Sequence, residues 1–455
     1  MSIAQLMASI AGELALFAAV GFFLFSLDDL VVDILYFTRR FWRTATVYRQ
    51  HERAHADSFK TTRDDGWMAV FIPAWDESAV ITKMLRETLA RYGRADYRLF
   101  VGYYRNDPAT CAAVHAVDDE RIIPVEVDAD GPTTKAHCLN YLHDALIVEE
   151  TERGSSARAI ILHDAEDLVH PLELAVFDRL IDRAAAIQLP VIPLIDRESP
   201  WIGGHYCDEF AESHGKELVV REAVGASIPL AGVACAIRRD AMARLAAQHE
   251  GTPFSGDSQT EDYELGLRLG ALGMKTMFVR IPALPGEHQV VATQGHFPST
   301  LDGAVRQKAR WIGGIALAGW DRLGWRGRLG EYWMRMRDRR GPLAALFLAA
   351  GYLAALLWSQ LWLAKSFGAP VDLGVGPALQ LLLLINAAFL TWRLAMRFGF
   401  TAATYGIWQG FLSIPRIVIG NIITMLAVKR ALGFHLRGGA PRWDKTAHVF
   451  PETST

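Results

Sequence analysis

The residues of this chain with the clearest chemical potential form one acidic cluster, His163 to Asp167, which reads His-Asp-Ala-Glu-Asp. It follows the apolar run Ala159 to Leu162, which is typical of a buried β-strand. Open α/β sheets bind their ligands at the carboxyl ends of strands, where this cluster would lie. Carboxylates so close together repel one another unless a cation joins them, and Mg²⁺, which usually brings substrate phosphates, is a natural partner. The alternative is an ordinary acidic helix start, with Pro171 marking the helix.

The elements that must position this cluster are predicted by alternating strand-like and helix-like segments. The strand-like segments before the cluster are Met68 to Ile72, Leu99 to Tyr103 and Ile122 to Val127. Because such alternation continues to roughly Arg280, we expect βαβ units and a mostly parallel sheet covered by helices.

Polar residues follow each of these strands. They are Asp76, Glu77, Asp107, Asp128 and Asp130. Lys135 then opens a helix after a Gly-Pro turn, a position that suits a bound phosphate. A solvated lysine at a helix start is the commoner interpretation of a lone residue of this kind.

Two motifs downstream of the cluster could also do chemistry. Thr260 to Asp262 opens a predicted helix, which is ordinary capping chemistry, but a helix-start carboxylate that faces a cleft can serve as a general base. Gln307, Arg310 and Trp311 lie within one turn of a helix predicted from Leu301, so they can share a face. Since indole offers an apolar platform and guanidinium binds phosphate in a bidentate manner, this set suits a sugar diphosphate.

The composition predicts one large domain plus membrane helices, because 51% of the 455 residues are hydrophobic. Ile3 to Leu27 is apolar apart from Glu13, which predicts a spanning helix within residues 1–38. A signal peptide is disfavoured because no Lys or Arg precedes the apolar run. Basic residues follow it at Arg39, Arg40, Arg43 and Arg49. They predict a cytoplasmic connector at residues 39–66 and an N-terminus outside.

A second membrane block is predicted at residues 342–432. Leu343 to Ala364 and Pro377 to Trp392 are long enough to span. The preceding residues 321–341 mix aromatic residues with many arginines, which predicts an amphipathic helix on the cytoplasmic membrane face.

The stretch Tyr405 to Val428 is long enough to span, but Pro415 and Arg416 lie in its middle. A central arginine is costly in lipid, and a third span here would carry the basic tail at residues 433–455 outside. We therefore expect an interfacial or re-entrant helix and a cytoplasmic tail.

Charge and cysteine usage exclude some classes. A net charge of −3 gives no indication of nucleic-acid binding. The four cysteines are far apart and form no C-x-x-C pair, so we expect reduced, buried thiols in a cytosolic domain.

Taken in order, the motifs resemble those of membrane-bound family 2 glycosyltransferases of the cellulose and hyaluronan synthase type. The matching residues are Pro73 to Glu77, Asp164-x-Glu166 in place of D-x-D, Thr260 to Asp262, and Gln307-x-x-Arg310-Trp311. Glu166 departs from the usual second Asp of D-x-D, which leaves Asp167 as an alternative ligand. The residues Gly131 to Ala136 and His163 to Asp167 look most like the bacteriophage-adsorption protein B branch, which is associated with making a surface exopolysaccharide.

The resemblance implies a GT-A fold, which is a Rossmann-like α/β domain, at residues 67–320. It also implies an inverting, metal-dependent transfer from a nucleotide sugar, usually UDP-linked. Asp262 would deprotonate the acceptor hydroxyl, and Asp164 and Glu166 would hold Mg²⁺ or Mn²⁺ on the diphosphate. The implied donor-binding residues are Asp76, Glu77, Asp107, Lys135, Asp164, Gln307 and Arg310. The implied acceptor-binding residues are Ala231, Gly232, Glu261 and Trp311.

The expected setting is the bacterial inner membrane, with several passes and a cytoplasmic catalytic domain that extends a polysaccharide. The predicted spans are few for a translocating synthase, so export would need a second copy of the chain or a partner in the periplasm or outer membrane. The alternatives are transfer of one sugar to a lipid-linked acceptor and a non-catalytic membrane scaffold that serves as a phage-receptor component.

Overall fold

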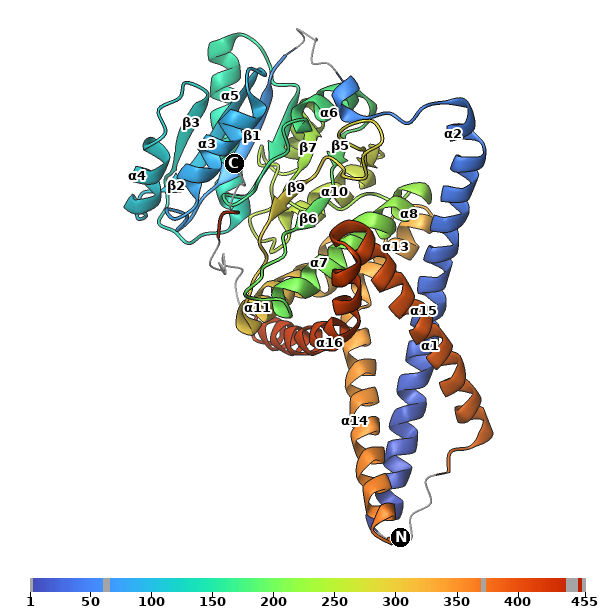
Figure 1. Cartoon of the computed structure of the whole chain (residues 1–455). Coiled ribbons are helices and arrows are strands. Elements are labelled where there is room, and N and C mark those ends of the chain that lie inside the picture. Colours follow the sequence, from blue (N-terminus) through green and yellow to red (C-terminus); the bar gives the residue numbers. More distant parts are fainter. Residues whose placement is uncertain (1–2, 60–65, 370–373, 439–448, 452–455) are drawn as a thin grey trace.

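The computed structural model of this chain describes residues 3–59, 66–369, 374–438 and 449–451. Its α/β part is built on a seven-stranded sheet with the order β3-β2-β1-β4-β7-β5-β8 (Figure 1). The first four strands are parallel neighbours: β1 (Met68–Pro73), β2 (Tyr97–Tyr104), β3 (Ile122–Val127) and β4 (Ala159–Leu162). The four strand-like segments predicted from the sequence are therefore confirmed.

The other half of the sheet contains its antiparallel pairings. β7 (Cys235–Arg238) runs antiparallel to both β4 and β5 (Ala186–Gln188), whereas β8 (Thr276–Phe278) is parallel to β5. β6 (Val191–Pro193) and β9 (Thr293–Gly295) pair in a separate two-stranded sheet. The mostly parallel α/β fold predicted from the sequence is thus present.

Helices cover both faces of the sheet because its central strands are apolar on both sides. Along β1, Val70 and Ile72 belong to one hydrophobic cluster, and Ala69 and Phe71 belong to the other. The first cluster is covered by α3 (Ile81–Tyr92), α4 (Pro108–His115) and α6 (Glu173–Leu180). The second is covered by α5 (Lys135–Arg153), α9 (Arg239–Ala247) and α10 (Glu261–Ala271).

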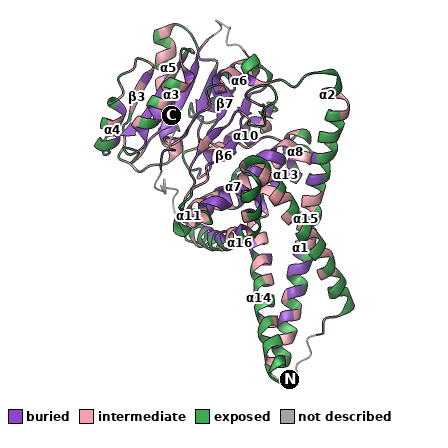
Figure 2. Cartoon of the chain, viewed as in Figure 1, coloured by how far each residue is buried: buried purple, intermediate pink, exposed green. Residues whose placement is uncertain are grey.

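Three long helices extend together away from the α/β domain (Figure 1). They are α1 (Ile3–Ala45), α14 (Gly341–Ser366) and α15 (Pro377–Tyr405). With α16 (Ile407–Leu436), they are the four described helices long and apolar enough to cross a membrane. Their outer ends are largely exposed (Figure 2), as lipid-facing helices would be. α1 has 43 residues, so at about 1.5 Å per residue it is roughly twice as long as a bilayer core is thick and runs past the predicted boundary at residue 38.

α16 lies crosswise under the α/β domain, against α7 (Ile202–Glu212) and α11 (Leu301–Ile312) (Figure 1). Its Arg416 is 1% exposed and donates hydrogen bonds to the Pro200 carbonyl (2.7 Å), Gln409 Oε1 (2.7 Å) and Asp208 Oδ1 (3.2 Å). A Cβ at Gly204 would lie 2.6 Å from the guanidinium carbon. The arginine that argued against a span from the sequence is therefore enclosed in protein.

The described end of the chain returns to the α/β domain. Phe450 is 6% exposed and belongs to the hydrophobic cluster on the α3 and α6 face of the sheet. The predicted tail residues 439–448 and 452–455, which include Arg442 and Lys445, lie outside the described residues.

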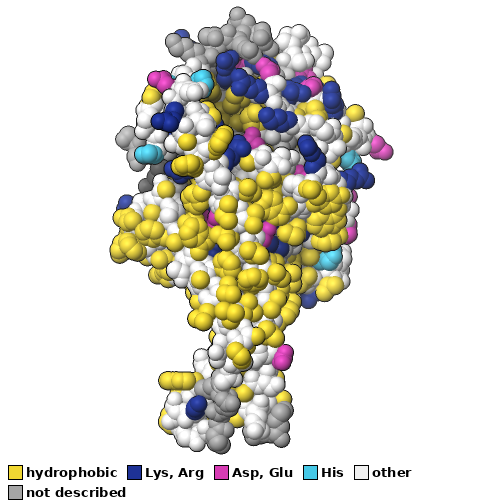
Figure 3. Space-filling model, turned by 90° about the vertical axis from the view of Figure 1, so that its right-hand side faces the viewer, with side chains coloured by type: hydrophobic (Ala, Val, Ile, Leu, Met, Phe, Trp, Pro, Cys, Tyr) yellow, Lys and Arg dark blue, Asp and Glu magenta, His cyan; other side chains and the backbone are white. Residues whose placement is uncertain are grey.

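The stretch predicted as an amphipathic helix contains α12 (Gly319–Leu323) and α13 (Leu329–Arg339). On α13, Leu329, Tyr332 and Met336 are exposed, whereas Met334 and Arg335 are buried. A side view shows a broad band of hydrophobic side chains with Lys and Arg gathered above it, toward the α/β domain (Figure 3). The remaining elements are α2 (Val47–Gln50), η1 (Ala56–Ser58), η2 (Ile181–Arg183), the π-helical segments η3 (Ser213–Glu217) and η4 (Gly313–Ala318), and α8 (Leu218–Ala223).

Candidate active site

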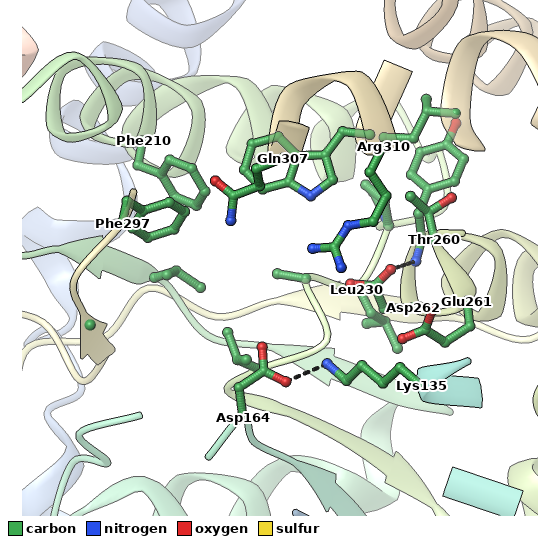
Figure 4. Close-up of a pocket in the computed structure, with 18 of the residues that line it drawn as sticks. Lys135, Asp164, Phe210, Leu230, Thr260, Glu261, Asp262, Phe297, Gln307 and Arg310 are labelled. Carbon is green, nitrogen blue, oxygen red and sulfur yellow. Dashed lines mark hydrogen bonds and ion pairs between the residues drawn. The ribbon is translucent and has the colours of Figure 1, made fainter. Parts of the chain in front are cut away.

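A cavity of about 320 Å³ lies between the carboxyl end of β4 and the helices α7 and α11. Polar residues from several elements meet in it (Figure 4). The predicted site residues that line it are Lys135, Asp164, Glu166, Asp167, Ala231, Glu261, Asp262, Gln307, Arg310 and Trp311. Residues more than 170 positions apart in the sequence are thus brought into one site.

Lys135 provides the cation that its neighbouring carboxylates require. Its Nζ lies 2.5 Å from Asp164 Oδ1, and the helix that it opens begins at an N-cap formed by Thr134. Burial alone would lower the pKa of Lys135, but the carboxylates of Asp164, Glu261 and Asp262 outweigh it and raise the pKa above its ordinary value. The ammonium is therefore charged, and it joins the β4 end of the site to the α10 end.

Asp164 is held in place by a buried polar group behind it. Asp167 Oδ2 accepts hydrogen bonds from the Asp164 backbone N–H (3.0 Å) and from His163 Nδ1 (2.9 Å). The other ring nitrogen of His163 lies 2.7 Å from Glu173 Oε1. Burial would lower the pKa of His163, but Glu173 and Asp167 raise it to about 10, so both ring nitrogens carry protons and each donates to one carboxylate. One oxygen of the Asp167 carboxylate is thus occupied in bracing the cluster.

Asp262 reaches the site through the close approach of Gly232. Gly232 has a φ of +74°, and a Cβ on it would lie 2.6 Å from Asp262 Oδ2 and 3.2 Å from Lys135 Nζ. The Tyr263 backbone N–H donates to Asp262 Oδ1 (2.7 Å), which fixes the carboxylate at the start of α10. Burial raises the pKa of Asp262, with Lys135 opposing the rise. Burial and the Asp262 charge raise the pKa of Glu261 to about 7.

The helix α11 supplies the opposite wall. Arg310 extends from it toward the side on which Lys135 and Asp164 lie, and Gln307 lines the cavity on the side of Phe210 and Phe297 (Figure 4). Trp311 belongs to an aromatic group, with ring centroids 6.4 Å from Phe210 and 6.5 Å from Phe297. The cavity therefore has a charged side suited to a phosphate and an aromatic side suited to a sugar face.

Three predicted donor-binding residues lie at other strand ends and do not line this cavity. Asp107 caps α4 by accepting from the Thr110 backbone N–H (3.2 Å), and it also accepts from the Asp76 backbone N–H (2.6 Å). The Glu77 backbone N–H donates to Thr110 Oγ1 (2.9 Å). These contacts join the loop after β1 to the loop after β2.

Among the cavity residues that had not been predicted from the sequence, four are polar or aromatic residues that shape its walls. Gln188 braces the loop beside Asp262, since its Oε1 accepts from the Ala231 N–H (2.8 Å) and its Nε2 donates to the Val233 carbonyl (2.9 Å). A lone polar residue in the apolar run Ala184 to Leu189 was the available signal. The other three are Phe210, His214 and Phe297. They give no local signal because ordinary core residues have the same sequence pattern.

The donor set suits a divalent ion held jointly with phosphates. Among the residues described, no group of three or more His, Cys, Asp and Glu side chains forms a metal site. Mg²⁺ and similar ions that bind through one or two carboxylates plus substrate phosphates need no such group, and Asp164 and Glu166 both line the cavity.

Comparison with known proteins identifies the family of this chain. Residues 159–406 match the model of the family described as Glycosyl transferase family group 2. The chain belongs to this family. It is therefore a family 2 glycosyltransferase, as the order of its motifs predicted.

Two relatives and one solved structure are similar to this chain. Bacteriophage adsorption protein B of Escherichia coli K12 and bacteriophage N4 adsorption protein B of Escherichia coli O157:H7 are each 35% identical over 97% of this chain. The chain spans 62% of the length of each. A mannosyltransferase from Pyrobaculum calidifontis, solved in complex with GDP-Man and Mn²⁺, matches this chain with a TM-score of 0.52 and 17% sequence identity. The match covers 97% of this chain and 100% of the mannosyltransferase chain. That likeness confirms the GT-A fold.

The close approach of Gly232 gives a testable prediction. Gly232→Ala should lower the transfer rate by about a hundredfold, because its methyl group would displace Asp262 and Lys135. Gly225→Ala is the matched control, since Gly225 has a φ of +72° and a Cβ there would meet nothing within 4 Å. Both variants should lose roughly 1 kcal/mol of stability, as measured by thermal melting, because both strain the backbone. Equal transfer rates in the two variants would contradict this account of the loop.

Proposed function

We propose that this chain transfers a sugar, with inversion, from a UDP-linked donor to a growing exopolysaccharide at the bacterial inner membrane. The observation that carries the proposal is the convergence of Lys135, Asp164, Asp262 and Arg310 on one cavity with an aromatic wall. Such a site has positive charge for a leaving diphosphate and a carboxylate for an acceptor proton. An inverting transfer needs one base for the acceptor proton and no carboxylate nucleophile, in contrast to retaining glycosidases.

On the donor side, Lys135, Gln307 and Arg310 bind the diphosphate. Asp164 and Glu166 would hold Mg²⁺ or Mn²⁺, which when bound neutralises charge on the leaving group. Asp76, Glu77 and Asp107 bind the nucleoside, since they lie at neighbouring strand ends beyond the cavity.

On the acceptor side, Asp262 removes the proton of the attacking hydroxyl. Ala231 and Gly232 border the acceptor with their backbone, and Glu261 lies beside the base. Trp311 stacks on the acceptor sugar, together with the rings of Phe210 and Phe297.

A lipid-linked acceptor is a second candidate, and one observation favours it. Among the residues described, four helices are long and apolar enough to span a membrane, and α16, one of the four, lies crosswise under the α/β domain. Either a second copy or an export partner completes a polysaccharide passage, or the enzyme adds one sugar to a lipid-linked acceptor.

The deciding experiment uses purified protein in lipid with a panel of radiolabelled nucleotide sugars and Mn²⁺. A donor that yields free nucleotide and labelled product supports the proposal, and no nucleotide release from any donor would overturn it. Product size over time then separates the acceptors. High-mass product at low conversion indicates repeated addition, whereas one added sugar under excess donor indicates the lipid-linked acceptor.

Asp262→Asn should keep donor binding and lose transfer, because it removes the proton acceptor with little change in volume. The expected loss is about a hundredfold or more, or roughly 3 kcal/mol in the barrier. Since burial raises the pKa of Asp262, wild-type transfer should rise with pH through a midpoint above the ordinary value of 3.8 and be lost below it. Initial rates across pH check this, and a near-wild-type rate for the variant would show that another group is the base.

The metal assignment can be tested by substitutions within the acidic cluster. Asp164→Ala and Glu166→Ala should weaken metal-dependent UDP binding, and chelator should mimic them in the wild type. Asp167→Ala should act through stability, because Asp167 accepts from His163 and from the Asp164 backbone. Calorimetric titration of UDP with and without Mn²⁺ separates these effects. If only Asp167 matters for metal binding, the ligand pair is assigned to the wrong residues.

For topology, we propose a periplasmic N-terminus, a cytoplasmic α/β domain and a cytoplasmic tail. Phe450 supports a tail on the same side as that domain, because it packs into the domain core. The burial of Arg416 between α16 and α7 supports an α16 that lies at the interface. A reporter fused after Thr455 should be active only in the cytoplasm, and a periplasmic signal would mean that α16 spans.

A further inference from the structure

A buried ion group joins the first membrane helix to the wall of the cavity. Lys216 of η3 is 1% exposed, and its Nζ contacts Asp33 Oδ1 of α1 and Glu212 Oε1 of α7, the latter at 2.7 Å. Both carboxylates are almost fully buried. From α15, Trp392 Nε1 donates to Asp33 Oδ2 (2.8 Å) and Arg393 lies 2.8 Å from Glu212 Oε1. All these charges are paired, so the group can persist without water.

The same segment presents His214 to the cavity, two positions before Lys216. The Val191 backbone N–H donates to His214 Nδ1 (2.9 Å). The His214 ring lies 5.0 Å from that of Phe210, which in turn lies 4.8 Å from that of Phe297. The cavity-facing residues of α7 and η3 are therefore fixed on one side by β6 and on the other by the membrane helices.

The π-helical geometry makes this link sensitive to position. A π-helical segment bonds i to i+5 and so holds more residues per turn than an α-helix, a feature often found at functional sites. If η3 relaxed to α-helical bonding, residues after the change would rotate about the helix axis. Lys216 and His214 could then not both keep their present partners. The Asp33–Lys216 contact opposes that relaxation because a buried ammonium without its carboxylates is strongly disfavoured.

We propose that Asp33, acting through Lys216, is a positioning residue for the acceptor side of the cavity, so that helix α1 holds that wall in place. This inference rests on the proposed function and names the element that positions its acceptor wall. The acidic residues after the first span then have different roles. Asp28 and Asp29 form ion pairs with Arg337 of α13 and with Arg340, which lies between α13 and α14, whereas Asp33 contacts Lys216 of η3.

The test uses the full chain in lipid nanodiscs, with Asp33→Asn, Lys216→Met and the double variant. Asp33→Asn keeps an acceptor for Trp392. The double variant removes both opposite charges, so it should fold even if Lys216→Met alone does not. Asn386→Leu is the matched control, because Asn386 donates from α15 to the Ala19 carbonyl of α1 (2.9 Å) and is remote from η3.

The first readout is hydrogen exchange, which requires no substrate. In the double variant, amides at residues 210–218 should exchange about tenfold faster than in the wild type, while β1 and β4 stay protected. The control should match the wild type at residues 210–218. Unchanged exchange at these residues, or faster exchange throughout the chain, would overturn the proposal.

The second readout is the ratio of labelled sugar incorporated to nucleotide released, with the donor that the wild type turns over. The double variant should release nucleotide to water within about twofold of the wild-type rate, but its incorporation ratio should fall about tenfold. An unchanged ratio of incorporated sugar to released nucleotide, whether or not both quantities fall, would overturn an acceptor-side role. If the wild type turns over no donor, the proposed function fails, and the exchange measurement alone still decides whether α1 positions η3.

Discussion

One ammonium group, that of Lys135, satisfies the charge balance on which the site depends. The ammonium contacts Asp164, and the negative charges of Asp164, Glu261 and Asp262 raise the pKa of Lys135. Without a cation there, carboxylates at the ends of β4 and α10 would repel one another across a half-buried cavity. The fold places a cation at this point by starting α5 beside β4, so that the first residue of the helix reaches both strand-end and helix-start carboxylates. In the function proposed above, the phosphates of a donor would reach this same ammonium.

The sheet and the order of its first strands follow from apolar runs that can be read in the sequence, because strands buried on both faces need continuous hydrophobic residues. The acidic cluster, the start of α10 and the α11 motif were also predicted, since each is a set of polar residues at an element boundary. The role of Asp167 could not be predicted. Its sequence position makes it equivalent to Glu166, and only the fold brings His163 and Glu173 against it.

The aromatic wall of the cavity could not be predicted from the sequence either. Phe210 and Phe297 lie on different elements and approach each other only because β6 and β9 form a second sheet beside the main one. No periodicity in either segment distinguishes them from core residues. Gln188 is intermediate, because a glutamine within an apolar strand requires partners, but the sequence does not reveal that they are the backbone groups of the loop at Ala231 to Ala234.

The division of the cavity into a charged side and an aromatic side follows from which layer supplies each wall. The sheet ends supply Lys135 and Asp164, whereas α7 and α11 supply the rings of Phe210 and Trp311. These two helices also lie against α16, whose Arg416 is buried against α7. The aromatic side of the cavity therefore belongs to the layer that contacts the membrane helices, whereas Lys135 and Asp164 belong to the sheet layer and Arg310 lies opposite them on α11. A donor that dissolves in water and an acceptor held near the bilayer would reach the reacting carboxylate from these two different directions.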